Sequence, residues 1–137
     1  MGVILDSSAV IAGERKGQTA ADLLAGLRLV LGPEPLALST VCVVELEHGV
    51  WRAKDAAQAK RRRQFFDDLF AAVPSYPLTF DIARRTARID AEARRKGVTI
   101  PFQDLVIGAT ALEFGYAVAT LNVRHFGLIP NLTVKPL

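Results

Sequence analysis

Short apolar runs alternate along the chain with longer segments in which apolar residues recur every three or four positions. The short runs are rich in Val, Ile, Leu and Ala, which predicts buried strands. They cover residues 2–5, 36–39, 116–120 and a last stretch near 132–134. Pro74 and Pro77 frame one further brief extended piece. Strands that alternate with helices predict a mainly parallel α/β sheet covered on both faces.

Six helices are predicted between these strands, and their ends carry recognisable signals. Capping hydroxyls precede three of them, at Thr19, at Ser39 or Thr40, and at Thr79. Gly97 and Gly115 stand at two helix ends, where glycine is favoured. The predicted helices cover about residues 7–14, 19–31, 40–51, 55–73, 79–97 and 101–115.

The apolar stripes of these helices predict which faces are buried. The stripe of the helix over 55–73 consists of Phe65, Phe66, Leu69, Phe70 and Val73. We expect the helix over 40–51 to turn inward Val43, Val44, Leu46, Val50 and Trp51. In the helix that follows Thr79, the expected inward residues are Phe80, Ile82, Ala83 and Ile89. The helix over 101–115 is apolar nearly all round, so Asp104 in its first turn needs a partner.

Composition favours one compact domain over residues 1–137. Half of the residues are hydrophobic, and there is no internal repeat, linker or low-complexity segment. The N-terminal segment lacks the basic flank and long apolar stretch of a signal peptide, and no apolar run reaches the ~20 residues that cross a bilayer. The single Cys42 forms no internal disulfide and is expected to be a small buried side chain. These features predict a cytoplasmic protein without a membrane segment.

The charge balance is mildly basic. Seventeen Lys and Arg residues against fourteen Asp and Glu residues give a formal net charge of +3, which favours a polyanionic partner. Basic residues concentrate at positions 60–63 and 84–96. We interpret both runs first as solvated helix faces, with contacts to a nucleic-acid backbone as the alternative.

Four polar side chains are the candidates for chemistry. Asp6 ends the first strand, and Asn122 follows the strand over 116–120. Glu45 and Asp104 lie in the early turns of helices. Working groups in open α/β sheets collect beyond the carboxyl ends of the strands, so these four are expected to meet at one edge. Carboxylates held together repel one another unless a cation neutralises them, and hard oxygen ligands favour Mg²⁺ or Mn²⁺.

Each acid also has a purely structural interpretation. Asp6 precedes a helix and can be its N-cap. Glu45 can pair with a neighbouring base or complement its helix dipole, and Asp104 can be an ordinary first-turn acid. The two histidines, His48 and His125, lack the spacing of metal ligands.

Three stretches together resemble the PIN-domain ribonucleases, and in particular the VapC-type toxins of bacterial toxin–antitoxin pairs. They are "VILDSSAVIA", "LALSTVCVVELEHGV" and "IPFQDLVIGATALEFGYAVATLNVRHF". The resemblance implies a three-layer α/β/α sandwich in which Asp6, Glu45 and Asp104 bind Mg²⁺ or Mn²⁺. It also implies an RNA substrate, a cognate antitoxin as partner, and a homodimer. Such an enzyme hydrolyses RNA phosphodiester bonds, because a divalent ion activates the attacking water and offsets the accumulating negative charge.

The sequence departs from the family pattern at its end. The family often adds a fourth acid near the strand over 116–120, where this chain has Asn122, and some relatives carry Asp where this chain has His125. Asn122 is expected to contribute a neutral oxygen or to hold a water, which disfavours a second metal ion. A catalytically silent PIN-fold binding module is the main alternative. A receiver-like phospho-acceptor domain is disfavoured, because Ser7 and Ser8 follow Asp6 and the chain stops at Leu137.

Overall fold

The computed structural model describes residues 1–137 and contains a five-stranded sheet in the order β3-β2-β1-β4-β5. Every adjacent pair of strands runs parallel. The strands are β1 (Val3–Leu5), β2 (Leu36–Ser39), β3 (Ser75–Tyr76), β4 (Ala117–Thr120) and β5 (Val134–Pro136). The predicted mainly parallel sheet is confirmed, and it is parallel throughout.

The three central strands are completely enclosed. β1, β2 and β4 are buried at every position because helices cover both faces of the sheet, whereas the edge strands β3 and β5 are only partly buried. β5 lies two residues later than predicted. The backbone turns at Asn131, which has a φ of 66°, before Val134 pairs with Val118.

Seven helices connect the strands. They are α1 (Ser7–Arg15), α2 (Ala20–Leu31), α3 (Thr40–Trp51), α4 (Ala56–Ala72), α5 (Phe80–Arg95), α6 (Phe102–Phe114) and α7 (Val123–Phe126). The first six were predicted within about two residues at each end, and only the four-residue α7 was missed. The hydroxyls of Thr19, Ser39 and Thr79 accept backbone N–H bonds at the starts of α2, α3 and α5, which confirms them as caps. None of the helices combines the length and the apolar character that a membrane span requires.

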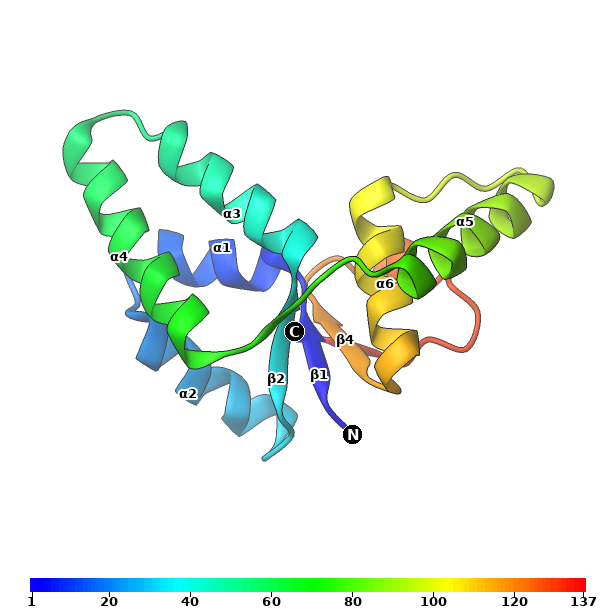
Figure 1. Ribbon diagram of the computed structural model, residues 1–137. Helices are drawn as coiled ribbons and strands as arrows, with labels where there is room; N and C mark the ends of the chain where they lie inside the picture. Colours follow the sequence, from blue (N-terminus) through cyan, green and yellow to red (C-terminus); the bar gives the residue numbers. More distant parts are fainter.

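The strand order explains how the helices divide between the two faces of the sheet. From β1 through β2 to β3 the chain moves toward one edge, and β4 then returns to the other side of β1. Because parallel crossovers are right-handed, this reversal places the connecting helices on opposite faces. Helices α1 to α4 lie on one side of the sheet, and α5 and α6 lie on the other (Figure 1). The expected three-layer sandwich is confirmed.

Each face of the sheet has its own apolar core. The core under α1 to α4 includes the predicted stripe residues Phe65, Phe66 and Leu69 of α4, and the core under α5 and α6 includes Ile82 and Ile107. Burying one such side chain stabilises the fold by about 1.5–3 kcal/mol. The middle of α6 is buried on all sides, as its sequence predicted.

Two residues of α3 that were expected to face inward do not. Val44 is exposed, and the side chain of Trp51 is 80% exposed. The buried stripe of α3 is instead Cys42, Leu46 and Val50, which recur every four residues on one line along the helix. Val44 and Trp51 lie away from that line, so the prediction was wrong for both.

The inward face of α5 was also predicted too broadly. Its buried residues are Ile82, Thr86, Ile89 and Ala93, a single stripe at spacings of four and three. Phe80 and Ala83 are off this stripe and exposed, and Arg84 lies 5.8 Å from the centre of the Phe80 ring. The N-terminal aromatic of α5 therefore contacts a guanidinium at the surface rather than the core.

Candidate functional site

The carboxyl ends of β1 and β4 lie side by side at the point where the strand order reverses. Asp6 directly follows β1, and Thr120 is the last residue of β4. The Asp6 backbone N–H donates to the Ala119 carbonyl at 3.0 Å, which ties the two strand ends together. Ligands of open α/β sheets bind at such a reversal. The topology therefore makes this edge the candidate site.

Asp6 occupies the N-cap position of α1, but its side chain does not cap the helix. One carboxylate oxygen, Oδ2, accepts hydrogen bonds from the hydroxyls of Ser8 and Thr120, each at 2.8 Å. The other oxygen accepts none, and it is not sealed from solvent. Asp6 is 6% exposed and forms no ion pair with Lys or Arg. The interpretation of Asp6 as a capping residue is wrong.

The hydroxyls that hold Asp6 are themselves fixed by the backbone after β4. Thr120 Oγ1 accepts the backbone N–H of Asn122 at 2.9 Å, and Ser8 Oγ accepts that of Leu121 at 3.2 Å. Each hydroxyl therefore accepts a backbone bond and donates to the carboxylate. The Asn122 side chain is exposed and makes no hydrogen bond. Asn122 thus reaches the acids through its backbone, by way of Thr120.

Glu45 is held by a hydroxyl as well. Its Oε2 atom accepts a hydrogen bond of 2.6 Å from Ser7 Oγ, which connects the start of α1 to the second turn of α3. Ser7 is buried, and no Lys or Arg forms an ion pair with Glu45. Pairing with a neighbouring base, one of the structural interpretations of Glu45, is wrong.

Asp104 lies in the first turn of α6 and has an imidazole as its partner. Its Oδ2 is 2.8 Å from Nδ1 of His125 in α7. Burial raises the pKa of Asp104 above its ordinary value, although the hydrogen bond with His125 opposes that shift. The negative charges of Asp6 and Glu45 raise the pKa of Asp104 further, so both acids are near enough to act on it.

We call Asp6, Glu45 and Asp104 the acidic edge. No group of three or more His, Cys, Asp and Glu side chains lies close enough together in the structure to hold one metal ion. Glu45 is engaged by Ser7, and Asp104 is engaged by His125. The structure therefore brings the three acids to one edge of the sheet without closing them onto a single point.

Cys42 lies beside the acidic edge, but it is not available for chemistry. It is completely buried, and its Sγ is 3.6 Å from the Leu5 carbonyl oxygen. Burial raises the pKa of the thiol strongly, and the charges of Asp6 and Glu45 raise it further. The prediction that Cys42 is a small buried side chain is confirmed.

Four arginines of the two basic runs are paired with carboxylates. The pairs are Arg62 with Glu14, Arg63 with Glu47, Arg85 with Glu113 and Arg94 with Asp90. These guanidiniums connect neighbouring helices or successive turns of one helix. Their charges are already balanced within the fold.

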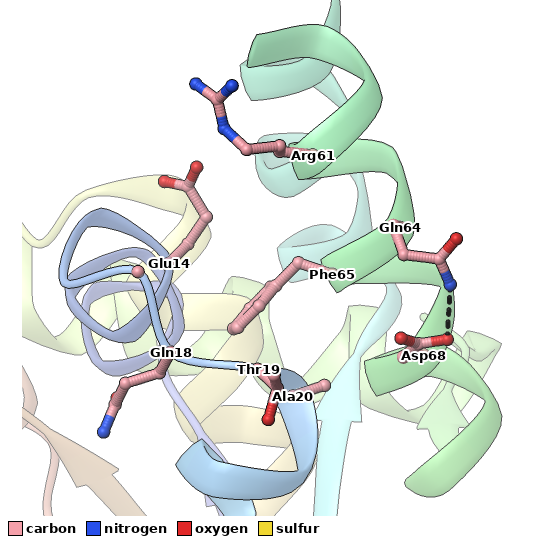
Figure 2. A pocket seen from close by; sticks show the side chains of 9 residues that line it. Glu14, Gln18, Thr19, Ala20, Arg61, Gln64, Phe65 and Asp68 are labelled. Carbon is pink, nitrogen blue, oxygen red and sulfur yellow. Dashed lines mark hydrogen bonds between the residues drawn. The ribbon is translucent and has the colours of Figure 1, made fainter. Parts of the chain in front are cut away.

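A separate polar depression lies between the α1–α2 connection and α4. In Figure 2, Phe65 lies at its centre, with Glu14 and Arg61 on one side, and Gln64 donates to Asp68 at 2.9 Å. None of the four predicted site residues lines this depression. It is therefore distinct from the acidic edge.

Sequence reasoning missed the side chains that hold the acids. Ser7, Ser8 and Thr120 are adjacent to strand ends that were identified, and their hydroxyls were the available signal. His125 lies 21 residues from Asp104, and nothing local in the sequence relates the two. The contact arises only when α7 packs against α6.

Comparison with known proteins identifies a matching family and several relatives of this chain. The PIN domain family model matches residues 3–128. The chain is 34% identical over 130 residues to Ribonuclease VapC10 from Mycobacterium tuberculosis, an alignment that covers 95% of this chain and 90% of the relative.

Two solved structures share the fold. The structure of VapBC2 from Rickettsia felis bound to a DNA fragment from their promoter is similar with a TM-score of 0.84, at 21% identity, covering 100% of this chain and 99% of the other. VapBC-5 from Mycobacterium tuberculosis, a member of the VapBC family of toxin-antitoxin systems, is similar with a TM-score of 0.76, at 24% identity, covering 100% and 98%. At these identities the likeness concerns the fold.

Proposed function

The chain belongs to the PIN-domain family, and from this premise we propose that it is a divalent-metal-dependent endoribonuclease, the toxin of a toxin–antitoxin pair. The observation that carries the proposal is the acidic edge. Three carboxylates from separate parts of the chain lie beyond the carboxyl ends of the strands, and none forms an ion pair with Lys or Arg. Such an arrangement is costly unless a cation is bound there.

The residues present suit a hard divalent cation. Asp6, Glu45 and Asp104 would hold Mg²⁺ or Mn²⁺ through carboxylate oxygens, and one oxygen of Asp6 is free to do so. A divalent ion held there would supply Lewis-acid chemistry, which lowers the pKa of a bound water and offsets negative charge on a phosphate. Because the acids do not close onto one point, binding one ion through all three would require at least one side chain to change its rotamer.

The surrounding side chains position these acids. Ser8 and Thr120 fix one oxygen of Asp6 and leave the other without a hydrogen bond, and Ser7 holds Glu45. His125 orients Asp104 through Nδ1. We assign Asn122 a role through its backbone contact and its neutral side-chain oxygen, which adds no charge to the site.

We further propose a cognate antitoxin as partner, a homodimer as the assembly, and the cytoplasm as the site of action. Support for a partner comes from the solved relatives, which belong to toxin-antitoxin systems by name, and from the large apolar side chains of Leu29, Val30 and Trp51, which are exposed in the isolated chain. Residues 1–137 are taken as one PIN domain.

A catalytically silent binding module of the same fold is the second candidate. It is favoured by the open arrangement of the acids and by Asn122 and His125, which add no further carboxylate to them. An RNA-cleavage assay distinguishes the two, using a fluorescent RNA with Mn²⁺, with Mg²⁺ or with EDTA. We expect cleavage with either ion, none with EDTA, and at least a hundredfold loss in Asp104→Asn.

The control variant is Asp81→Asn, which removes an exposed carboxylate from the first turn of α5. It should cleave as fast as the wild type. If the wild type does not cleave RNA under any of these conditions, the silent binding module is supported instead.

A further inference from the structure

A charged cleft leads outward from the acidic edge between α1, α3 and α4. Five charged side chains line it, namely Glu14, Arg15, Glu45, Arg52 and Arg62. Glu45 belongs to the acidic edge, so the cleft opens onto the candidate site. Helices α1 and α3 both begin where the central strands end and extend toward the same side of the molecule (Figure 1). We call this feature the arginine cleft.

The wall of the arginine cleft that α4 contributes is fixed and electrically balanced. Arg62 donates from Nε to Glu14 at 3.2 Å and from Nη1 to the Gly49 carbonyl at 2.6 Å. Both partners of the ion pair are largely buried, with 18% and 14% of the side chains exposed. Arg62 therefore connects α1, α3 and α4 and has little charge left for a ligand.

Arg15 and Arg52 are in the opposite situation. Both line the cleft, both are exposed, and neither forms an ion pair with any carboxylate. Arg15 is nine residues beyond Asp6 and Arg52 is seven beyond Glu45, which places them about 13 and 10 Å further along their helices. Two guanidiniums that form no ion pair thus lie in the same cleft as Glu45, and they lie further out than the acids.

We propose that Arg15 and Arg52 bind backbone phosphates of the RNA outward from the bond that is cut, and that the arginine cleft is the path of the RNA away from the acidic edge. The inference rests on the proposed function. A polyanion that approaches three carboxylates needs cationic contacts close to them, and a guanidinium binds a phosphate oxygen pair bidentately.

Helix capping alone does not account for the placement. Arg15 and Arg52 each stand at a helix C-terminus, where a cation stabilises the helix dipole by about 0.3–1 kcal/mol. That role is fulfilled from any side of the helix end. It gives no reason for both arginines to line one cleft together with Glu45.

The test measures RNA binding without cleavage. In the Asp104→Asn background, we would add Arg15→Gln or Arg52→Gln and titrate a fluorescein-labelled, mixed-sequence 12-nucleotide RNA at several salt concentrations. Each substitution should weaken binding three- to tenfold and lower the slope of log affinity against log salt by about 0.7 per lost phosphate contact. Arg15→Lys and Arg52→Lys should retain most of the slope, because they keep the charge.

Arg28→Gln is the matched control, since Arg28 is exposed near the end of α2 and does not line the cleft. It should bind RNA within twofold of the parent. In the otherwise wild-type enzyme, Arg15→Gln and Arg52→Gln should raise KM with little change in kcat, and their melting temperatures should match that of Arg28→Gln.

The outcomes separate this inference from the proposed function. If the wild type cleaves RNA while both glutamine variants bind with unchanged affinity and salt slope, the RNA does not use the arginine cleft, and only the inference fails. If the wild type neither cleaves nor binds RNA, both fail. If the two substitutions leave RNA binding intact but weaken the binding of a protein partner, the cleft is a protein interface and the inference is overturned.

Discussion

At the scale of single residues, the acids of the candidate site are held by hydroxyls and an imidazole rather than by Lys or Arg. Thr120 and Ser8 hold Asp6, Ser7 holds Glu45, and His125 pairs with Asp104. A guanidinium would neutralise a carboxylate and compete with a metal ion, whereas a hydroxyl orients it and leaves its charge in place. This choice of partners is what keeps negative charge available at the edge.

Asp104 gives a pH-dependent prediction. Its pKa is raised in the folded protein, chiefly by burial, so the metal-free native state binds this proton more tightly than the unfolded state. The contribution to stability is then fully present below about pH 4 and is lost as the pH rises through the raised pKa. Without metal, Asp104→Asn should therefore melt above the wild type at neutral pH, and the difference should vanish near pH 3. A variant that melts below the wild type at pH 7 in EDTA would contradict this.

The hydroxyl of Thr120 can be tested with an isosteric change. Thr120→Val removes the hydrogen bond to Asp6 and leaves the Asn122 N–H without its acceptor. The loss should lower the free energy of unfolding by about 1–3 kcal/mol. It should also weaken Mn²⁺ binding several-fold, because Asp6 loses its orientation, while Thr120→Ser should restore most of the affinity. Calorimetric titration of the three proteins measures this. Equal affinities in all three would mean that Thr120 has a structural role only.

At the scale of elements, α7 and the residues that follow it must lie close to α6 for His125 to contact Asp104. A Cβ atom on Gly108 would lie 2.5 Å from the end of the Ile129 side chain. Ile129 is buried and follows α7 by three residues. The missing side chain at Gly108 therefore allows the chain that carries His125 to lie against α6.

Gly108→Ala should accordingly destabilise the protein, although alanine is normally the better helix former by about 1 kcal/mol. Overpacking of this kind costs about 1–3 kcal/mol, and the net loss is measurable by urea unfolding. Gly26→Ala is the control. Gly26 lies in the middle of α2, and a Cβ atom there has no neighbour within 4 Å, so this substitution should stabilise the protein. Stabilisation by both substitutions would show that the approach at Gly108 is not tight.

The elements themselves were largely predictable, because their signals are local. Thr19 and Thr79 cap helices in any context, and the apolar runs of β1 and β4 are short enough to identify strands. Two other kinds of information are not local. The exposure of Trp51 depends on where α4 covers α3, and the pairing of His125 with Asp104 depends on how α7 docks.

At the scale of the whole molecule, the reversal of strand order brings Asp6, Glu45 and Asp104 to one edge of the sheet. It also places different helices on the two faces of the sheet. The order of acids along the chain and the parallel sheet made this edge predictable. The orientations of the Glu45 and Asp104 side chains were not predictable, because their hydrogen bonds with Ser7 and His125 determine them.

A toxin of this design should slow bacterial growth when it is expressed without its partner. Asp6→Ala should relieve the effect, because it removes a carboxylate from the acidic edge and leaves the core intact. Growth curves at matched expression levels, checked by immunoblot, measure this. Equal growth with the wild type and the variant would count against toxicity.

The acidic edge is expected to bind a divalent cation, and calorimetric titration of Mn²⁺ measures that binding. We expect one well-bound ion per chain in the wild type, at least tenfold weaker binding in Asp104→Asn, and tighter binding in Asn122→Asp, which adds a negative charge to the segment that contacts the acids through Thr120. No measurable Mn²⁺ binding in the wild type, or unchanged binding in Asp104→Asn, would show that the acidic edge is not a metal site.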